Sequence, residues 1–185
     1  SELLMGGVAL FFVLTSAMSM IPATTFSREG KHLWFPRTLP LTIDQILAGR
    51  ILGAQVINGA GALLSVIAVA VVFRFPPLVV FLGCVLGVLL STSFASLLTI
   101  LDLARPMLNW TNPVKAVKSN LNSVFAMTIG LGVCFGLGWV MYLLVQAGLG
   151  YLIFVELVFS AALFRSLYRA LVGRYARARW RRIEA

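Results

Sequence analysis

The chain has 185 residues, of which 60% are hydrophobic and only 11% are charged. A soluble globular domain carries about 25% charged residues, so the composition excludes that class and indicates an integral membrane protein. The formal net charge is +9, but a nucleic-acid-binding protein needs its bases spread along a soluble face. We therefore expect no nucleic-acid partner.

Stretches without charge follow one another along the chain and are long enough to cross a bilayer, which takes about 20 apolar residues in a helix. The run from Ser119 to Val155 is too long for one span, and the sequence AGLG at 147–150 marks its break. The pattern predicts an all-α polytopic bundle within one transmembrane domain, 1–185. Its five spans are expected at about 3–21, 51–73, 77–101, 121–145 and 150–172.

Positive charges define the expected orientation. Of the 15 lysines and arginines, only Arg74 falls between spans two and three. The others lie between spans one and two, between spans three and four, or at the C-terminal end. Basic loops stay in the cytoplasm, so we expect an external N-terminus, cytoplasmic loops at 22–50 and 102–120, and a cytoplasmic tail at 173–185 that touches anionic lipid. An external start, an odd number of spans and Ser1 in place of Met suggest that an earlier span is missing.

The first cytoplasmic loop reads TFSREGKHLWFPRTLP from Thr25. A helical wheel separates its residues into two faces: Phe26, Gly30, Leu33 and Trp34 against Ser27, Arg28, Glu29, Lys31 and His32. The pattern predicts a short amphipathic helix in the membrane interface, ending before Pro36. Thr42 and Gln45 have capping-box spacing and predict the start of the helix that becomes span two.

The second cytoplasmic loop reads DLARPMLNWTNPVKAVKSN from Asp102. Asp102 and Arg105 are three residues apart, which predicts an exposed ion pair worth at most about 1 kcal/mol and a role in positioning the loop. Pro106 is expected to end the helix before it. Lys115 and Lys118 fall in the first turns of the next expected helix, where the dipole disfavours cations. Membrane topology or a surface for a partner protein would explain why these two lysines lie there.

Small and polar residues within the spans indicate how the helices pack. Gly83 with Gly87, and Gly132 with Gly136, form small-xxx-small faces, for which packing within the chain is favoured over a dimer interface. Six polar residues either line a path or cross-link helices: Gln55, Asn58, Ser91, Thr92, Ser93 and Ser96. Glu156 is the only clearly intramembrane acid and therefore a candidate proton or ion site. A contact with the interface or a polar neighbour is the favoured interpretation.

Groups for catalysis are scattered along the sequence. One histidine excludes an HExxH metal site, and neither a GxSxG motif nor a phosphate-binding loop occurs. The six acidic residues form no close pair, and Cys84 and Cys134 lie within spans. We expect a chain that is not an enzyme and that holds no cofactor or metal of its own.

Both internal loops carry a family resemblance. SREGKHLWFPRTLPLT followed by ILAGR resembles the cytoplasmic segment after the second span of permeases in the second class of ABC exporters, notably a bacterial group. DLARPMLNWTNPVKAVKSNLN is similar to the next cytoplasmic loop of that group. The resemblance implies that this chain holds spans two to six of a six-span unit in the bacterial inner membrane. It also implies a coupling helix that docks on a separate ATPase subunit, which holds ATP and Mg, and a second permease half or homodimer partner.

The resemblance assigns residues to these roles. Coupling to the ATPase would rest on Arg28, Glu29, Gly30, Lys31, Trp34, Leu39 and Pro40. The matching residues of the second loop are Asp102, Arg105, Pro106, Asn109, Trp110, Lys115 and Lys118. The expected function is ATP-driven alternating access for a substrate that the sequence leaves open. The alternatives are an ion-coupled secondary transporter using Glu156 and, less favoured, a membrane-embedded enzyme.

Overall fold

The computed structural model describes residues 1–110, 112, 114, 117 and 120–172, with the backbone alone for Lys31, Leu33 and Arg37. Within these residues the chain is all helical, and five helices are long and apolar enough to cross a membrane. The long helices are α1 (Glu2–Met18), α3 (Ile43–Phe73), α4 (Pro77–Ala104), α6 (Leu121–Gln146) and α7 (Ile153–Leu171).

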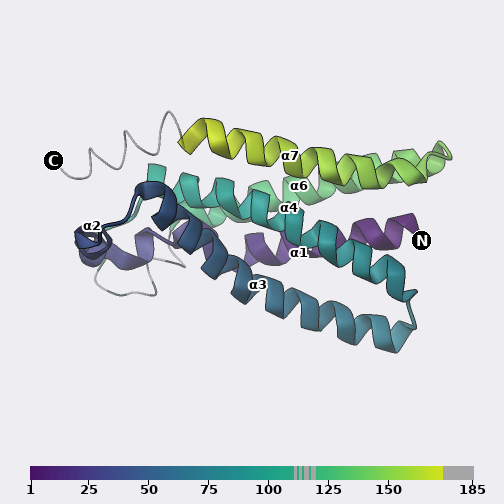
Figure 1. Ribbon diagram of the computed structural model, residues 1–185, viewed down its shortest axis with the longest axis horizontal. Coiled ribbons are helices and arrows are strands. Elements are labelled where there is room, and N and C mark those ends of the chain that lie inside the picture. The colour runs from purple at the N-terminus through teal and green to yellow at the C-terminus, as the bar shows by residue number, and fades with distance from the viewer. Residues whose placement is uncertain (111, 113, 115–116, 118–119, 173–185) are drawn as a thin grey trace.

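The long helices lie side by side along the longest axis of the molecule (Figure 1). The short segments η1 (Pro22–Thr24), η2 (Ser27–Trp34) and α2 (Phe35–Thr38) gather at one end, together with residues 105–110. We call this the loop end. The N-terminus, the α3–α4 turn and the α6–α7 turn with η3 (Gly150–Leu152) lie at the opposite end, which we call the hairpin end.

Local sequence signals explain where the helices begin and end. The Thr42 side chain accepts a hydrogen bond from the Gln45 backbone N–H, and the Gln45 side chain accepts one from the Thr42 N–H, which confirms the predicted capping box. α4 ends at Ala104, before Pro106, as expected. The predicted break between α6 and α7 is also confirmed, because Gly148 takes a φ of +72°, which favours glycine.

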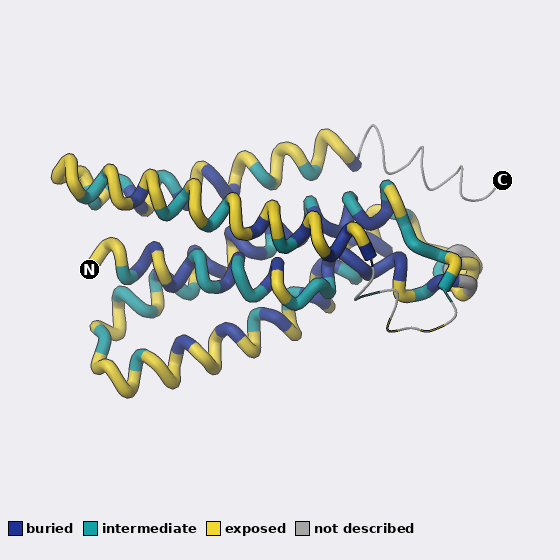
Figure 2. The backbone as a smooth tube through the Cα atoms, turned by 180° about the vertical axis from the view of Figure 1, so that it is seen from behind, coloured by how far each residue is buried: buried dark blue, intermediate teal, exposed yellow. Residues whose placement is uncertain are grey.

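The main core cluster joins buried residues of α1, α4, α6 and α7, and in Figure 2 the buried backbone is densest toward the loop end. Gly83 and Gly87 allow α1 to approach α4 closely: a Cβ at Gly83 would lie 2.8 Å from the Val8 Cβ, and one at Gly87 would lie 2.7 Å from the Phe12 ring. This bears out the expected packing role of the first glycine pair within the chain.

The second glycine pair does not pack within the described chain. Nothing lies within 4 Å of a Cβ built at Gly132 or Gly136, so their predicted packing within the chain is wrong. Gly130, two residues earlier on α6, makes the close contact instead, since its Cβ would overlap that of Ala17 on α1. Gly132 and Gly136 do share one face of α6, but a different face of that helix packs against α1.

Candidate functional site

The first loop is not the single amphipathic helix that its sequence pattern predicts. Gly30 has φ +51° and ψ −121°, which interrupts η2. The expected apolar face is divided as well: the Phe26 side chain is fully buried, whereas Trp34 is 58% exposed. A helical wheel assumes one uninterrupted helix, and a glycine in the left-handed region breaks that assumption.

Pro36 does not end a helix at Phe35, which corrects a second expectation. Phe35 has helical dihedrals (φ −62°, ψ −49°) and begins α2, with Pro36 in its first turn. Proline is tolerated there because the N–H groups of a first turn have no acceptor within the helix. The chain leaves helical geometry only at Leu39, which is extended.

Asp102, at the loop end of α4, is fully buried rather than exposed. Its Oδ2 atom accepts hydrogen bonds from the backbone N–H groups of Phe26 (2.6 Å) and Ser27 (3.0 Å). Its Oδ1 atom accepts bonds from the Ser27 hydroxyl and from Asn122 Nδ2 (3.0 Å). The predicted pair with Arg105 is therefore wrong; among the described residues Arg105 is exposed and forms no ion pair.

These bonds join three elements through one carboxylate. Phe26 precedes η2 and Ser27 begins it, Asp102 belongs to α4, and Asn122 lies in the first turn of α6. Hydrogen bonds to an ionised acceptor are about twice as strong as neutral ones, and a carboxylate is favoured beside the N–H groups that open a helical segment. Asn122 also donates to the Arg105 carbonyl at 2.9 Å, which fixes the chain leaving α4.

The second loop packs onto the first through Trp110. Its Nε1–H donates to the Ser27 carbonyl at 2.7 Å, and its ring covers Gly30, where an added Cβ would lie 2.7 Å from the ring. The Ser27 hydroxyl also accepts a bond from the Met107 N–H at 2.9 Å. Gly30 is thus needed both for its backbone angle and for the space that Trp110 occupies.

Glu29 faces Arg50 of α3 and not a free polar surface, which corrects its expected position. Arg50 Nη2 lies 2.5 Å from Glu29 Oε1, with side-chain exposures of 12% and 29%. Arg50 Nη1 also donates to the Thr25 carbonyl at 2.7 Å, and the guanidinium lies 4.1 Å from the centre of the Phe26 ring. The Phe26 side chain fills a cluster with Ile46, Leu47, Ile100, Leu103 and Val172.

We call this set of contacts the loop junction, made of Phe26, Ser27, Glu29, Gly30, Arg50, Asp102, Trp110 and Asn122. It fastens the first loop to the ends of α3, α4 and α6. Sequence reasoning missed Ser27, Arg50 and Asn122 as parts of it. Asp102 near the end of an apolar helix was the one usable signal, since a buried acid needs donors, but its spacing to Arg105 suggested a local partner.

The remaining predicted residues lie outside the loop junction. Arg28, Trp34, Leu39 and Pro40 are exposed, and the Trp34 and Phe35 rings meet edge to face with centroids 6.1 Å apart. We call Trp34, Phe35 and Leu39 the exposed tip. In the second loop Asn109 is exposed and Pro106 half-buried. Lys115, Lys118 and the Lys31 side chain lie outside the described residues.

The two polar candidates within the spans, Asn58 on α3 and Glu156 on α7, lie outside the loop junction. Asn58, in the middle of α3, is 8% exposed, and its Nδ2 atom makes no hydrogen bond within the described residues. Both carboxylate oxygens of Glu156, in the first turn of α7, are covered and without a hydrogen bond there. The described residues hold no group of three histidine, cysteine or acidic side chains suited to a metal.

No protein family, curated protein or solved structure matches the chain. Function is therefore inferred from the loop junction, from the polar residues within the spans, and from the resemblance of the two loops.

Proposed function

We propose that the chain is a membrane-spanning permease subunit of an ATP-driven ABC exporter in a bacterial inner membrane, with its loop end in the cytoplasm. ATP is hydrolysed on a separate subunit, and this chain moves the substrate by alternating access beside a second permease half or a second copy. The observation that carries the proposal is the loop junction, in the same segment that resembles the coupling region of such permeases.

The loop junction supports a mechanical role for the first loop. A segment that only spaces two helices needs no buried carboxylate, which is costly to desolvate unless donors surround it. Here Asp102 ties the start of η2 to α4 and α6, and Arg50 ties it to α3. A push on this loop would therefore reach the ends of three long helices rather than being absorbed by a flexible linker.

The exposed tip supplies the surface for the ATPase subunit. Trp34 and Phe35 are 58% and 56% exposed, and α2, which begins at Phe35, lies beyond the ends of the long helices (Figure 1). Aromatic side chains are typical anchors of protein interfaces. Arg28 is exposed on the same loop, whereas Glu29 is occupied by Arg50. In this proposal the tip makes contact with the ATPase and the loop junction transmits the motion.

A second candidate function rests on Glu156. Its two carboxylate oxygens are covered and have no hydrogen bond within the described residues. An intramembrane acid in such a setting is a candidate for proton or ion coupling. In that case the chain is a secondary transporter and the loop junction serves stability alone.

Two experiments test the proposal. In a background without Cys84 and Cys134, single cysteines at Thr38 and Phe75 report orientation: an impermeant thiol reagent should label intact cells only at position 75. When the tagged chain is purified from its native membrane, an ATPase subunit should co-purify with it. Replacing Trp34 and Phe35 by alanine should abolish this co-purification while the chain stays folded.

The outcomes separate the two candidates. Transport that requires ATP and fails with the tip variant supports the exporter. Transport driven by an ion gradient, lost in Glu156→Gln and unaffected by the tip variant, would replace it by the secondary transporter. Labelling at position 38 in intact cells would reverse the orientation and contradict the coupling role.

A further inference from the structure

The packing register between α1 and α3 brings two polar residues to the same level. The two helices run in opposite directions (Figure 1), and Val8 and Phe12 of α1 share a cluster with Ala62 and Val66 of α3. One turn further along α1 is Ser16, and one turn back from Ala62 is Asn58. Both are buried, so Ser16 and Asn58 lie at the next level of the same seam.

The register between α1 and α4 adds a third helix at that level. α4 runs parallel to α1, with Gly83 against Val8 and Gly87 against Phe12. One turn further, Ser91 faces the level of Ser16. Gln55 of α3 reaches the same place, since its Nε2 donates to the Ser91 hydroxyl at 2.8 Å. The register thus places Ser16, Gln55, Asn58 and Ser91 at one level of the seam between α1, α3 and α4, and we call these four residues the polar cluster.

This cluster retains unused hydrogen-bonding capacity. Ser16 Oγ, Gln55 Oε1 and Asn58 Nδ2 are covered and make no hydrogen bond within the described residues. Nearby hydroxyls on α4 do not share this state, because Ser93 donates to Leu89 O and Ser96 to Thr92 O within their own helix. A buried polar group without a partner costs about 1–3 kcal/mol. The three atoms, a donor, an acceptor and a hydroxyl that can be either, lie at one level of the helix register and are complementary to a polar ligand group.

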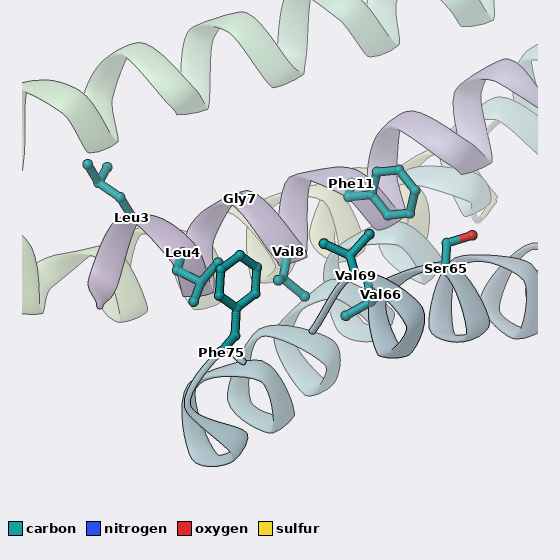
Figure 3. Close-up of a pocket in the computed structure, with 9 residues that line it drawn as sticks. All are labelled: Leu3, Leu4, Gly7, Val8, Phe11, Ser65, Val66, Val69 and Phe75. Carbon is teal, nitrogen blue, oxygen red and sulfur yellow. The ribbon is translucent and has the colours of Figure 1, made fainter. Parts of the chain in front are cut away.

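An apolar groove leads to the cluster. A cavity of about 470 Å³ lies between α1 and α3, and its lining includes Thr15, Met18, Ile57 and Asn58. A second cavity of about 280 Å³ adjoins it toward the hairpin end and shares Phe11 and Ser65 with it. Figure 3 shows this second cavity, bordered by Leu4 and Val8 on α1 and by Val66 and Val69 on α3. No charged side chain belongs to either lining.

We propose that this groove is a binding site for uncharged amphiphiles, molecules with an apolar body and one group that both donates and accepts hydrogen bonds, such as a hydroxyl or an amide. The apolar body lies along the seam between α1 and α3, and the polar group bonds to the polar cluster through Asn58. Ligand sites of this size with a few convergent polar groups are common in proteins. That such molecules are the exported substrate rests on the proposed function; the binding itself does not.

Asn58 is the entry to the polar cluster. It is the one member that also lines the groove, and rotation about its terminal torsion exchanges the positions of the amide nitrogen and oxygen. A ligand hydroxyl in the groove can therefore meet either a donor or an acceptor of Asn58. Charged molecules are excluded, because the site offers no opposite charge at a depth where an ion is costly.

Photolabelling of the purified chain, without any ATPase subunit, tests the site directly. The probe is a dodecanol that carries a diazirine in its chain, with adducts mapped by mass spectrometry. We expect adducts on groove residues such as Met18 and Ile57, prevented by dodecanol at concentrations about tenfold below those at which dodecane prevents them, as one added hydrogen bond requires. Asn58→Leu should remove this preference for the alcohol. Thr92→Val, whose hydroxyl donates to Val88 O outside the groove, is the matched control and should leave it intact.

Ser16→Ala serves as a second variant if Asn58→Leu fails to fold, and it should weaken the preference in the same direction. Equal competition by dodecane and dodecanol, or a preference that survives both variants, would overturn the site and leave only a lipid-facing crevice. A change of oligomeric state in Asn58→Leu would also overturn it, because Asn58 would then pair with a second copy. If the parent chain shows the photolabelling preference for the alcohol but no ATP-driven transport, the result would contradict the proposed function and not this site.

Discussion

At the loop end, the buried Asp102 carboxylate accepts four hydrogen bonds, whereas in the middle of the bundle three polar atoms, of Ser16, Gln55 and Asn58, make none within the described residues. The Asp102 carboxylate is thus fully paired, although Glu29 Oε2 and Arg50 Nε in the same loop junction make no hydrogen bond within the described residues. Removing a paired group leaves its former donors buried and unsatisfied, which destabilises the fold. Removing an unpaired group instead eliminates the free-energy cost of burying a polar atom without a hydrogen bond. The Asp102 bonds therefore hold the first loop to the helix bundle, whereas the unpaired atoms of the second cluster add no such bond and are open to the proposed ligand.

Asp102→Leu should produce the largest effect and tests the first half of this comparison. It removes the carboxylate that accepts from the N–H groups of Phe26 and Ser27 and one of the two acceptors of the Asn122 amide, and we expect a loss of about 3–5 kcal/mol. Thermal unfolding in detergent measures it. Arg105→Gln, at an exposed side chain one turn away, is the control and should change stability by less than about 0.5 kcal/mol.

Asp102→Asn distinguishes the observed arrangement from the exposed pair that the sequence suggested. An exposed pair predicts almost no change. In the observed site, an amide NH₂ group must face either two backbone donors or the Asn122 amide, so we expect a clear loss of stability. Unchanged unfolding of Asp102→Asn would contradict the role of Asp102 in the loop junction.

Gly30→Ala tests whether the second loop is held as tightly as the first. The substitution forces a side chain into φ +51° and against the Trp110 ring, and we expect a cost of about 2–4 kcal/mol from strain and crowding. Trypsin cleavage after Arg28 should accelerate in the variant, since Trp110 can no longer cover this segment. An unchanged cleavage rate would show that Trp110 does not hold the loop.

Gly130→Ala and Gly132→Ala test which face of α6 packs against α1, next to the polar cluster. A Cβ at Gly130 would overlap Ala17, and we expect a loss of about 1–3 kcal/mol. A Cβ at Gly132 meets nothing within 4 Å, so this variant should gain up to about 1 kcal/mol from helix propensity. Equal effects in thermal unfolding would place the packed face of α6 elsewhere.

Asn58→Leu should have the smallest effect and sharpens the second half of the comparison. Leucine has a similar shape and removes an unpaired donor, so stability should stay within about 1 kcal/mol of the parent or rise. The same thermal assay compares it directly with Asp102→Leu. A loss as large as that of Asp102→Leu would mean that Asn58 has a structural partner, and the binding site would lose its basis.

Much of the fold was predictable because local signals determine it. Charge-free runs gave five helices, Thr42 and Gln45 marked the start of α3, and the AGLG turn marked the break before α7. Gly83 and Gly87 were also identified correctly. The glycine face on α6 was not, because periodicity shows that two residues share a face but not which face meets α1.

The loop junction was the least predictable part, because its bonds join residues about 20 to 80 positions apart. Ser27 and Asn122 are ordinary polar residues whose importance comes only from the approach of Asp102. The sequence pattern placed Glu29 on an exposed polar face, because its ion-pair partner Arg50 lies 21 residues later, in the next long helix. The polar residues of the spans were visible in the sequence, but whether each hydroxyl or amide has a partner depends on the packing register.

Hydrogen exchange of the Phe26 and Ser27 amides, measured in lipid nanodiscs, tests most directly that Asp102 holds the first loop to the helix bundle. Both N–H groups donate to the Asp102 carboxylate, so we predict slow exchange in the parent chain. In Asp102→Leu these amides should exchange much faster, while those in the middle of α1 keep their protection. Fast exchange at Phe26 and Ser27 in the parent chain, or equal protection in the variant, would contradict this account.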